Sequence, residues 1–307
     1  MTGSPNPTRL TEEPAGSGFL GVDTEYDAAR VVLLPVPYDS TTSYVAGTRR
    51  GPQAIVEASH YVELHDEELG GDLTAAGIHT LPPLPPLVSG PSDMVDAVEA
   101  EVASHLECGK TLGLLGGEHS VTLGSVRAHL RRHPRLSVLQ LDAHADLRDQ
   151  YEGSPFSHAC VMRRVRELVP AVQVGIRSLS AAESAHAKAN ALPIVWAREV
   201  KRAPFDPARV IGGLTGEVYV TVDCDVFDSG MMPAVGTPEP GGLDWYDVVE
   251  LLDAVSRARK IIGFDVVELS PIPGLVAPDF LAARLVYRLL ALSLRSQGAL
   301  ITGRGGA

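Results

Sequence analysis

Several kinds of residue are scarce in this sequence, and each shortage excludes a class of protein. The 307 residues include only three cysteines, Cys108, Cys160 and Cys224, and no C-x-x-C pair. An odd number of widely spaced cysteines suits a reducing compartment better than a disulfide framework, so we expect a cytoplasmic protein. Lysine and arginine total 26 against 38 aspartates and glutamates, for a net charge of -12. Nucleic acids and anionic membranes bind clustered cations, so we expect neither as a partner.

Long hydrophobic runs are also missing. No window of the sequence approaches the apolar length that crosses a bilayer, and the first residues lack the apolar core of a signal peptide. Residues 1–28 are rich in proline, glycine, threonine and serine, which predicts an irregular N-terminal arm. Residues 29–307 contain no repeat or low-complexity insert, so we expect them to form one domain with a sizeable core.

What the sequence does contain is an alternation of apolar runs with helical patterns. The continuous apolar runs, which are typical of strands buried on both faces, are RVVLLPV, KTLGLLGG, LSVLQL, AVQVGI, EVYVTV and KIIGFDVV. Residues 92–109 and 244–260 predict amphipathic helices, the second with Asp244 as its N-cap, and residues 280–298 predict the last helix. The alternation predicts an α/β fold with a mostly parallel sheet between helices.

One polar segment follows directly behind a predicted strand. LDAHADLRD places Asp142, His144 and Asp146 two residues apart, so their side chains share one face if the backbone stays extended. Carboxylate oxygen and imidazole nitrogen are ligands for divalent metals of intermediate hardness. Taken alone, the segment is as consistent with a polar turn as with a metal site, and the other strand ends must decide between them.

Two further strand ends carry matching residues. Asp223 and Asp225 follow EVYVTV, and His119 follows the glycine pair after KTLGLL. In parallel sheets, sites form beyond the carboxyl ends of the strands, so the three segments are expected to converge. Together they supply four aspartates and two histidines, and four negative charges balance two divalent cations. Without thiolate ligands we expect manganese rather than structural zinc, with nickel, cobalt and iron as alternatives.

These segments resemble a known family. GGEHSVT, VLQLDAHAD and TVDCDVFD, followed by MPAVGTPEPGG, are similar to the signature segments of the ureohydrolases, which include arginases and agmatinases. PYDSTTSYVAGTRRGPQAI, SHACVMRR and FDVVELSP resemble agmatinases in particular. The resemblance implies an arginase-like three-layer α/β/α sandwich, a centre of two manganese ions, and a homo-oligomer of three or six subunits. It also implies which residues hold each metal: His119 and Asp146 one, His144 and Asp225 the other, with Asp142 and Asp223 bridging.

The resemblance further implies how the site works on a guanidino group. Two metals would lower the pKa of water and provide hydroxide to attack the guanidinium carbon, with Asp146 also orienting that hydroxide. Glu268 would pair with the guanidinium, unless it forms a strand-end ion pair instead. His158 would carry a proton to the leaving amine, unless it is a structural histidine. Thr237 would contribute an orienting hydroxyl.

The substrate is predicted less directly. Arginases meet the carboxylate of arginine with polar side chains, whereas the loop LRDQYEGSPFSH offers Asp149 and Glu152. These acidic groups favour the terminal ammonium of agmatine, so we expect agmatine to be cleaved to putrescine and urea. Arg148 either pairs with Asp149 or accepts the carboxylate of 4-guanidinobutyrate or a related guanidino acid. A phosphoesterase and a non-catalytic metal-binding homologue are the alternatives from other classes.

Overall fold

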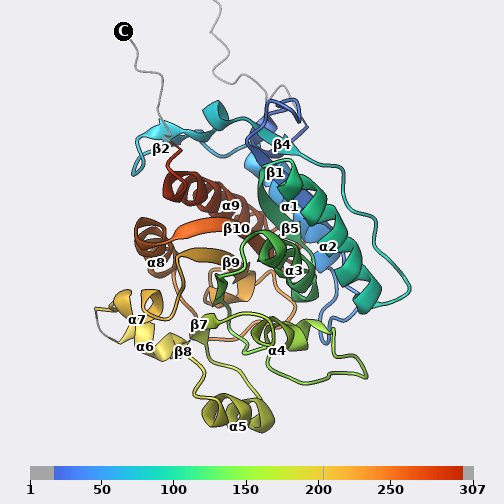
Figure 1. Ribbon diagram of the computed structural model, residues 1–307, viewed down its shortest axis with the longest axis vertical. Coiled ribbons are helices and arrows are strands. Elements are labelled where there is room, and N and C mark those ends of the chain that lie inside the picture. The colour runs from blue at the N-terminus through green and yellow to red at the C-terminus, as the bar shows by residue number, and fades with distance from the viewer. Residues whose placement is uncertain (1–16, 203, 300–307) are drawn as a thin grey trace, which may run out of the picture.

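The computed structural model describes residues 17–202 and 204–299, and at its centre lies an eight-stranded sheet (Figure 1). The order of the strands is β4-β1-β5-β10-β9-β6-β7-β8, and every pairing between them is parallel. The strands are β1 (Val31–Val36), β4 (Ile78–Thr80), β5 (Thr111–Gly116), β6 (Leu136–Leu141), β7 (Ala171–Ile176), β8 (Ile194–Trp196), β9 (Glu217–Asp223) and β10 (Lys260–Val267). A separate antiparallel pair consists of β2 (His65–Asp66) and β3 (Gly71–Asp72).

All six strands predicted from the apolar runs are present. β1, β5, β6 and β7 are buried along their whole length, as continuous apolar runs predict. The prediction missed β4 and β8, which lie at the two edges of the sheet and are three residues long. Both are only partly buried, so neither carries the continuous run that marks an interior strand.

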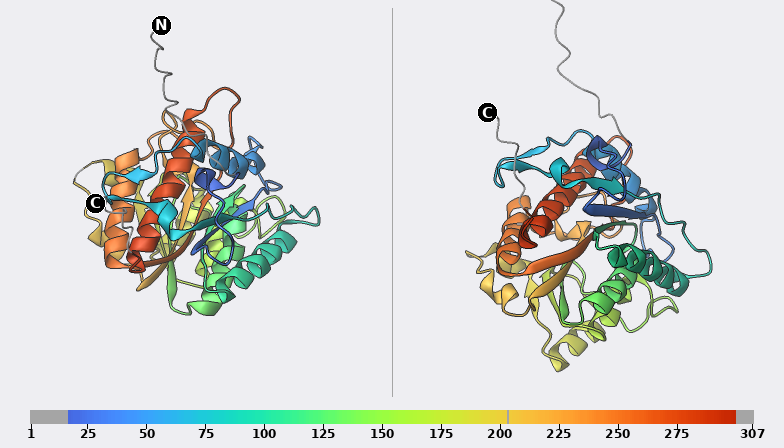
Figure 2. Two further views of the ribbon diagram at one scale, coloured as in Figure 1. Left: turned by 90° about the horizontal axis from the view of Figure 1, so that it is seen from above. Right: turned by 45° about the horizontal axis from the view of Figure 1, so that its top comes forward.

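Helices cover both faces of the sheet and complete the predicted three-layer sandwich. The helices are α1 (Gly51–Ser59), α2 (Pro91–Glu107), α3 (Thr122–Arg132), α4 (Val161–Arg166), α5 (Ala181–Ala189), α6 (Ala197–Lys201), α7 (Ala208–Ile211), α8 (Trp245–Ala258) and α9 (Ala277–Ser296). α9 packs between α1 and α8 on one face, while α2, α3 and α4 pack together on the other (Figure 2).

The predicted helices form for the expected local reasons. Asp244 caps α8: its side chain accepts the Asp247 N–H, while the Asp247 side chain accepts the Asp244 N–H. In α2 the apolar residues four apart are all buried against the sheet. α9 is buried nearly all round because it lies between two helices and β10.

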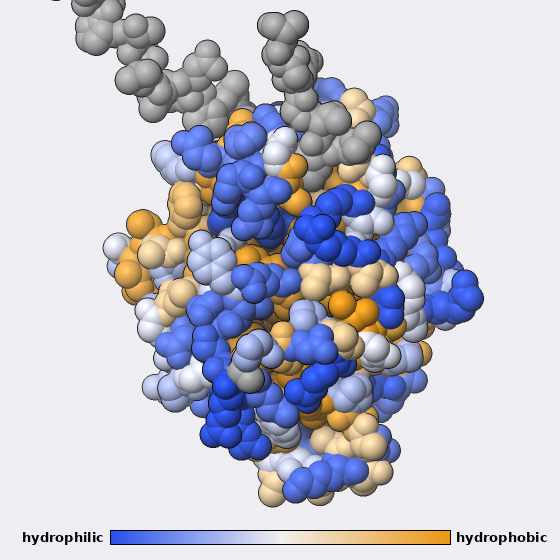
Figure 3. Space-filling model, turned by 90° about the vertical axis from the view of Figure 1, so that its left-hand side faces the viewer, coloured by the Kyte–Doolittle hydropathy of each residue, from blue (hydrophilic) through white to orange (hydrophobic). Residues whose placement is uncertain are grey.

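Part of the predicted N-terminal arm lies against the domain. Residues 1–16 fall outside the described part of the chain, but Phe19 and Leu20 are buried, and the Leu20 N–H donates to Ser59 Oγ on α1. Among the described helices, none is long and apolar enough to cross a membrane. On the side that carries α6, α7 and α8, hydrophilic side chains predominate, with smaller hydrophobic groups between them (Figure 3).

The strand order explains why distant segments meet. β5, β10, β9 and β6 are neighbours in the sheet, although 143 residues lie between β5 and β10, 36 between β9 and β10, and 75 between β6 and β9. Since they run parallel, their carboxyl ends lie at one edge. His119 follows β5, Glu268 follows β10, Asp223 ends β9 and Asp142 follows β6.

Candidate active site

The chain turns sharply where it delivers these residues. β6 stops at Leu141, and Asp146 lies in the left-handed region with φ 52°, so the expectation of an extended backbone through Asp146 is wrong. Asp225 lies in a 3-10 turn whose N-cap, Asp223, accepts the Asp225 N–H at 2.8 Å. Glu268 also has a positive φ, 65°. Such conformations cost about 1–3 kcal/mol each in non-glycine residues and concentrate at functional sites.

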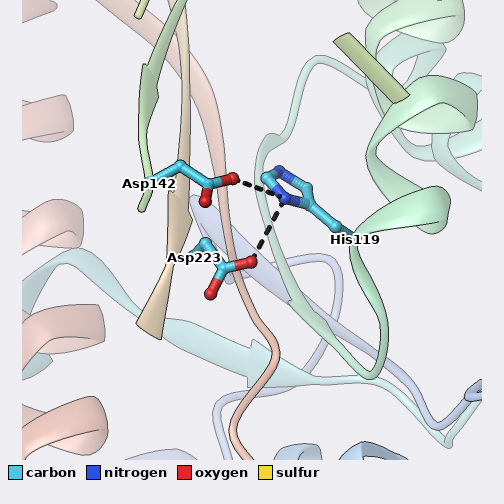
Figure 4. A group of neighbouring side chains, drawn as sticks. All are labelled: His119, Asp142 and Asp223. Carbon is cyan, nitrogen blue, oxygen red and sulfur yellow. Dashed lines mark ion pairs between the residues drawn. The ribbon is translucent and has the colours of Figure 1, made fainter. Parts of the chain in front are cut away.

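Three carboxylates surround the imidazole of His119. Its Nδ1 lies 3.1 Å from Asp142 Oδ2 and 3.3 Å from one oxygen each of Asp146 and Asp223. Figure 4 shows His119, Asp142 and Asp223 pointing toward one another from separate elements. On the far side of the ring, Nε2 lies 2.8 Å from Thr221 Oγ1, which holds the imidazole in place.

A second group forms around His144. Its Nδ1 lies 2.7 Å from Asp225 Oδ2 and 3.8 Å from Asp142 Oδ1. Asp142 therefore belongs to both groups, with one oxygen toward each histidine. The structure thus brings all six predicted ligands together, although it leaves the assignment of each to a particular metal as a prediction.

Burial and crowding disturb the charges of this cluster. Burial, followed by the charges of Asp225 and Asp146, raises the pKa of Asp142 to about 8. Burial alone would lower the pKa of His144, but the surrounding carboxylates, Asp225 first, raise it to about 11. Burial and Asp225 also raise the pKa of Asp223 well above its usual range. Within the described chain no lysine or arginine forms an ion pair with these aspartates, so the carboxylates compete for the two histidines and for protons.

The donor atoms fit divalent cations. Nδ1 of His119 is buried and has no hydrogen-bond partner among the described residues, yet it faces three carboxylate oxygens. A nitrogen aimed at carboxylates in this way is the arrangement that ligands adopt around a shared metal ion. Two sets of ligand atoms lie close enough together to hold an ion each: His119, Asp142 and Asp223, and Asp142, His144 and Asp225.

A cavity of about 270 Å³ lies over this cluster. Its lining includes His158, Thr237 and Glu268, the other residues predicted to act on the substrate. One oxygen of Glu268 accepts the His119 N–H at 2.8 Å, so the carboxylate is fixed at the base of the cavity. His158 Nδ1 lies 3.2 Å from Thr41 Oγ1, and its Nε2 lies 3.5 Å from Ser43 Oγ.

Asp149 is placed differently from the other predicted residues. It is not among the described residues that line the cavity, its side chain is 76% exposed, and it pairs with Arg164 at 2.6 Å. The suggested pairing with Arg148 is wrong: the Arg148 guanidinium lies over the ring of Tyr151 and 3.9 Å from Glu183. Arg148 does line the cavity.

Several residues of the site were missed by reasoning from the sequence. Glu118 is fully buried and accepts the hydroxyl and the N–H of Thr41, which fixes one wall of the cavity beside His158. Glu183 lines the cavity and accepts the N–H groups of Leu147 and Ser180. Glu118 stands inside GGEHSVT, directly before His119, so its position was a usable signal. Glu183 belongs to the capping-box motif Ser-x-x-Glu at the start of α5, which predicts the beginning of a helix but not a place in the site.

The fold and this site define a class of enzyme, and comparison with known proteins identifies it. The chain belongs to the arginase family, whose sequence model matches residues 29–291. Enzymes of this family depend on a binuclear metal centre, and the two ligand groups of the structure are suited to one.

Within that family the chain is an agmatinase-like ureohydrolase. It is 40% identical to an N(1)-aminopropylagmatine ureohydrolase of Synechocystis sp., over 95% of this chain and 98% of the relative. It is 34% identical to an agmatinase of Pyrococcus horikoshii, over 87% of this chain and 93% of the relative. The crystal structure of the agmatine ureohydrolase of Thermoplasma volcanium superposes with a TM-score of 0.83 at 32% identity, covering 92% and 96% of the two chains.

Proposed function

We propose that this protein releases urea from the guanidino group of an agmatine skeleton. The observation that carries the proposal is the convergence of the two ligand groups with Glu268 at the base of one cavity. A carboxylate beside the cation site can receive the planar guanidinium through paired N–H donors. The guanidinium carbon would then lie next to the ligand cluster, where a nucleophile is needed.

The cofactor that we propose is a pair of manganese ions, held by His119, Asp142, His144, Asp146, Asp223 and Asp225. Oxygen and imidazole donors without thiolate favour manganese among the divalent metals. When bound, such ions lower the pKa of water so that hydroxide is available near neutral pH.

The residues of this chain would then orient the substrate and the attacking oxygen, and protonate the leaving amine. Glu268, pinned by the His119 N–H, holds the guanidinium. Asp146, whose backbone is turned into the left-handed region, points its carboxylate into the cluster to hold the attacking oxygen. The oxygen of water bonds to the guanidinium carbon, the C–N bond to the alkyl chain breaks, and the leaving amine takes a proton. His158, at the cavity wall, supplies that proton.

The length of the alkyl tail distinguishes two candidate substrates. Agmatine ends in one ammonium, and its N(1)-aminopropyl derivative adds a second amine further out. We propose that the longer compound is the better substrate, because relatives named for it reach 40% identity, against 34% for the agmatinase of P. horikoshii. Glu183 in the cavity wall, and Glu239 with its carboxylate 3.9 Å from His144 Nε2, offer negative charge to such a tail.

Guanidino acids are disfavoured by the same wall. Arg148 is the cation that would receive a carboxylate, but Glu183 lies 3.9 Å from it, and its guanidinium already covers the ring of Tyr151. A substrate carboxylate would therefore meet Glu183 as well as Arg148.

A direct assay tests both parts of the proposal. The manganese-loaded protein is incubated with N(1)-aminopropylagmatine, agmatine, 4-guanidinobutyrate and arginine, and kcat/KM is measured from urea release. We expect the first compound to be cleaved most efficiently, agmatine next, and the two acids far more slowly. A higher kcat/KM for agmatine than for N(1)-aminopropylagmatine would make agmatine, with the shorter tail, the preferred substrate. Urea from none of the four would refute the proposed reaction.

A further inference from the structure

A line of buried amides runs from α4 to the ligand cluster. Both Nε and one terminal nitrogen of Arg166 donate to Gln173 Oε1, at 3.1 and 3.0 Å. Gln173 Nε2 donates to Gln140 Oε1 at 2.5 Å, and Gln140 Nε2 donates to Asp142 Oδ2 at 2.6 Å. Gln140 and Gln173 stand directly opposite each other on the paired strands β6 and β7.

The direction of every hydrogen bond in this line is determined by its two ends. Once a cation displaces its proton, the Asp142 carboxylate only accepts, so Gln140 must present its NH₂ to Asp142 and its oxygen to Gln173. A guanidinium only donates, so Gln173 must present its oxygen to Arg166 and its NH₂ to Gln140. Both requirements agree, and a flip of either amide would break at least two hydrogen bonds.

The same two amides hold the turn that carries the ligands. Gln173 Nε2 also donates to the carbonyl of Ala145 at 2.7 Å, and Gln140 Nε2 lies 3.5 Å from the carbonyl of His144. These carbonyls belong to the segment between Asp142 and Asp146. The line therefore fixes both a ligand side chain and the backbone that positions the next ligands.

Burying polar side chains in this way needs a reason. Gln140 and Gln173 are fully buried in mostly apolar strands, where polar groups are costly unless every hydrogen bond is made. Arg166 forms no ion pair with any described residue; its positive charge faces the amide line instead. Burial lowers the Arg166 pKa only to about 10, so the group remains charged at neutral pH.

We propose that Arg166, Gln173 and Gln140 are positioning residues for the metal centre: they orient Asp142 and the 142–146 turn so that these ligands are preorganised for binding divalent cations. Aligned amides polarise one another, and the cation at one end increases the donating strength of the NH₂ at the other. Each carboxylate oxygen has two lone pairs, so Asp142 Oδ2 can accept from Gln140 and bind a metal at the same time. This inference rests on the proposed metal-dependent function.

The test measures metal binding without substrate. Gln173→Leu removes the central link but touches no ligand side chain, and Gln297→Leu, at the end of α9, is the matched control because it removes a bonded glutamine far from the site. Manganese affinity is measured by competition with a fluorescent chelator. We expect Gln173→Leu to bind manganese about 10–100-fold more weakly than wild type. Gln297→Leu should bind it as wild type does.

Further variants separate orientation from folding. Gln173→Glu keeps the shape and gives Arg166 a carboxylate partner, but it cannot donate to Gln140 or to Ala145, so we expect weak manganese binding in a folded protein. Arg166→Lys keeps a donor and should retain most of the affinity, whereas Arg166→Met should not. In Gln173→Leu, Gln173→Glu and Arg166→Met, kcat at a given manganese concentration should fall more than KM changes, and excess manganese should restore it.

Three results have distinct meanings. Wild-type manganese affinity in both Gln173 variants would overturn the role of the line. Weaker binding in Gln173→Leu but not in Gln173→Glu would also overturn it, because packing alone would then account for the loss. A wild-type protein that binds no manganese, nickel, cobalt or iron would instead refute the proposed function on which the inference rests.

Discussion

Two buried acidic sites in this protein are neutralised in opposite ways. Asp66, on the β2–β3 hairpin, is buried and pairs with Arg288 of α9 at 3.1 Å, and Arg288 is itself buried. Backbone N–H groups of Glu68 and Leu69 also donate to Asp66. The chain supplies a cation and donors for this carboxylate, and the result is a fixed link between the hairpin and the last helix.

The ligand cluster has the same burial but no such partner. Asp142, Asp223 and Asp225 face two histidines and one another, and within the described residues no arginine or lysine forms an ion pair with them. Burying uncompensated charge is expensive, so a folded chain keeps such a cluster only when something else neutralises it. The difference separates a structural buried carboxylate from one that is built to bind a cation.

The largest expected effect comes from removing the charge that both ligand groups share. Asp142→Asn keeps the size of the side chain and should reduce manganese affinity and urea release by more than about 100-fold, the upper end of the losses that indirect ligand contacts cause. The pKa of Asp142 in the metal-free protein is about 8, so the group is already largely uncharged at neutral pH, and the metal-free variant should melt close to the metal-free wild type. Calorimetry and chelator competition measure both quantities. A variant that kept its metal but unfolded readily would show that Asp142, like Asp66, is a structural carboxylate.

The opposite pattern is expected at the paired site. Arg288→Met leaves Asp66 buried without its cation and should lower the free energy of unfolding by about 3–5 kcal/mol. Activity per folded molecule should stay near that of wild type, because the pair lies on the hairpin and α9 rather than at the cavity. Arg284→Met is the matched control: its partner Glu67 is mostly exposed, so the loss should be under about 1 kcal/mol. Denaturant unfolding with and without manganese measures all three proteins.

Metal removal should have an effect that depends on pH. In the folded metal-free protein the pKa of Asp142 is raised to about 8 and that of His144 to about 11. At a pH between the ordinary pKa of each group and this raised value, the folded protein keeps a proton that the unfolded chain has released. Stability from these groups is therefore present at low pH and is lost as pH rises through the folded pKa values. Manganese competes with those protons, so its affinity should rise with pH. The lowered pKa of Asp225, about 2, acts only in strong acid.

The measurement is the melting temperature at pH 6 and pH 8, with manganese and with a chelator. At one fixed manganese concentration we expect the gain to be larger at pH 8, because Kd is lower there; at whichever pH that concentration equals 100 times Kd, the gain should be about 3 kcal/mol. Equal gains at both pH values would mean that the ligands do not exchange protons for metal.

The accuracy of the sequence prediction also differed between two regions, the strands with their ends and the loops. The sheet was predictable because interior strands carry continuous apolar runs, and the ligand cluster because parallel strand ends meet at one edge. His119, Asp142 and Asp223 each lie at or just after such an end. The edge strands β4 and β8 lack the apolar run, so pattern alone could not reveal them.

Residues held by turns and loops were less predictable. The spacing of Asp142 and Asp146 suggested an extended backbone, but a positive φ at Asp146 brings its carboxylate to His119 instead. Glu183 reaches the cavity from the start of α5, and no spacing rule relates it to the ligands. Where tertiary packing of a loop decides which acidic side chain faces a substrate, the sequence offers charge but not direction.

The smallest expected effects compare two acidic residues near the substrate tail. Asp149 is exposed and paired with Arg164, so Asp149→Asn should change KM for agmatine or its aminopropyl derivative by less than about twofold. Glu183 lines the cavity. Arg148 lies 3.9 Å away and also covers the ring of Tyr151, so it neutralises Glu183 only in part, and much of the negative charge of Glu183 remains available to a substrate amine. Glu183→Gln keeps the size of the side chain and one of its two acceptor oxygens, and it should raise KM about fivefold, equivalent to about 1 kcal/mol, with kcat little changed. If Asp149→Asn had the larger effect, the loop would have to rearrange when substrate binds. Pairing with an arginine would then separate structural carboxylates from functional ones in the core, as it does for Asp66, but not at the rim of the cavity.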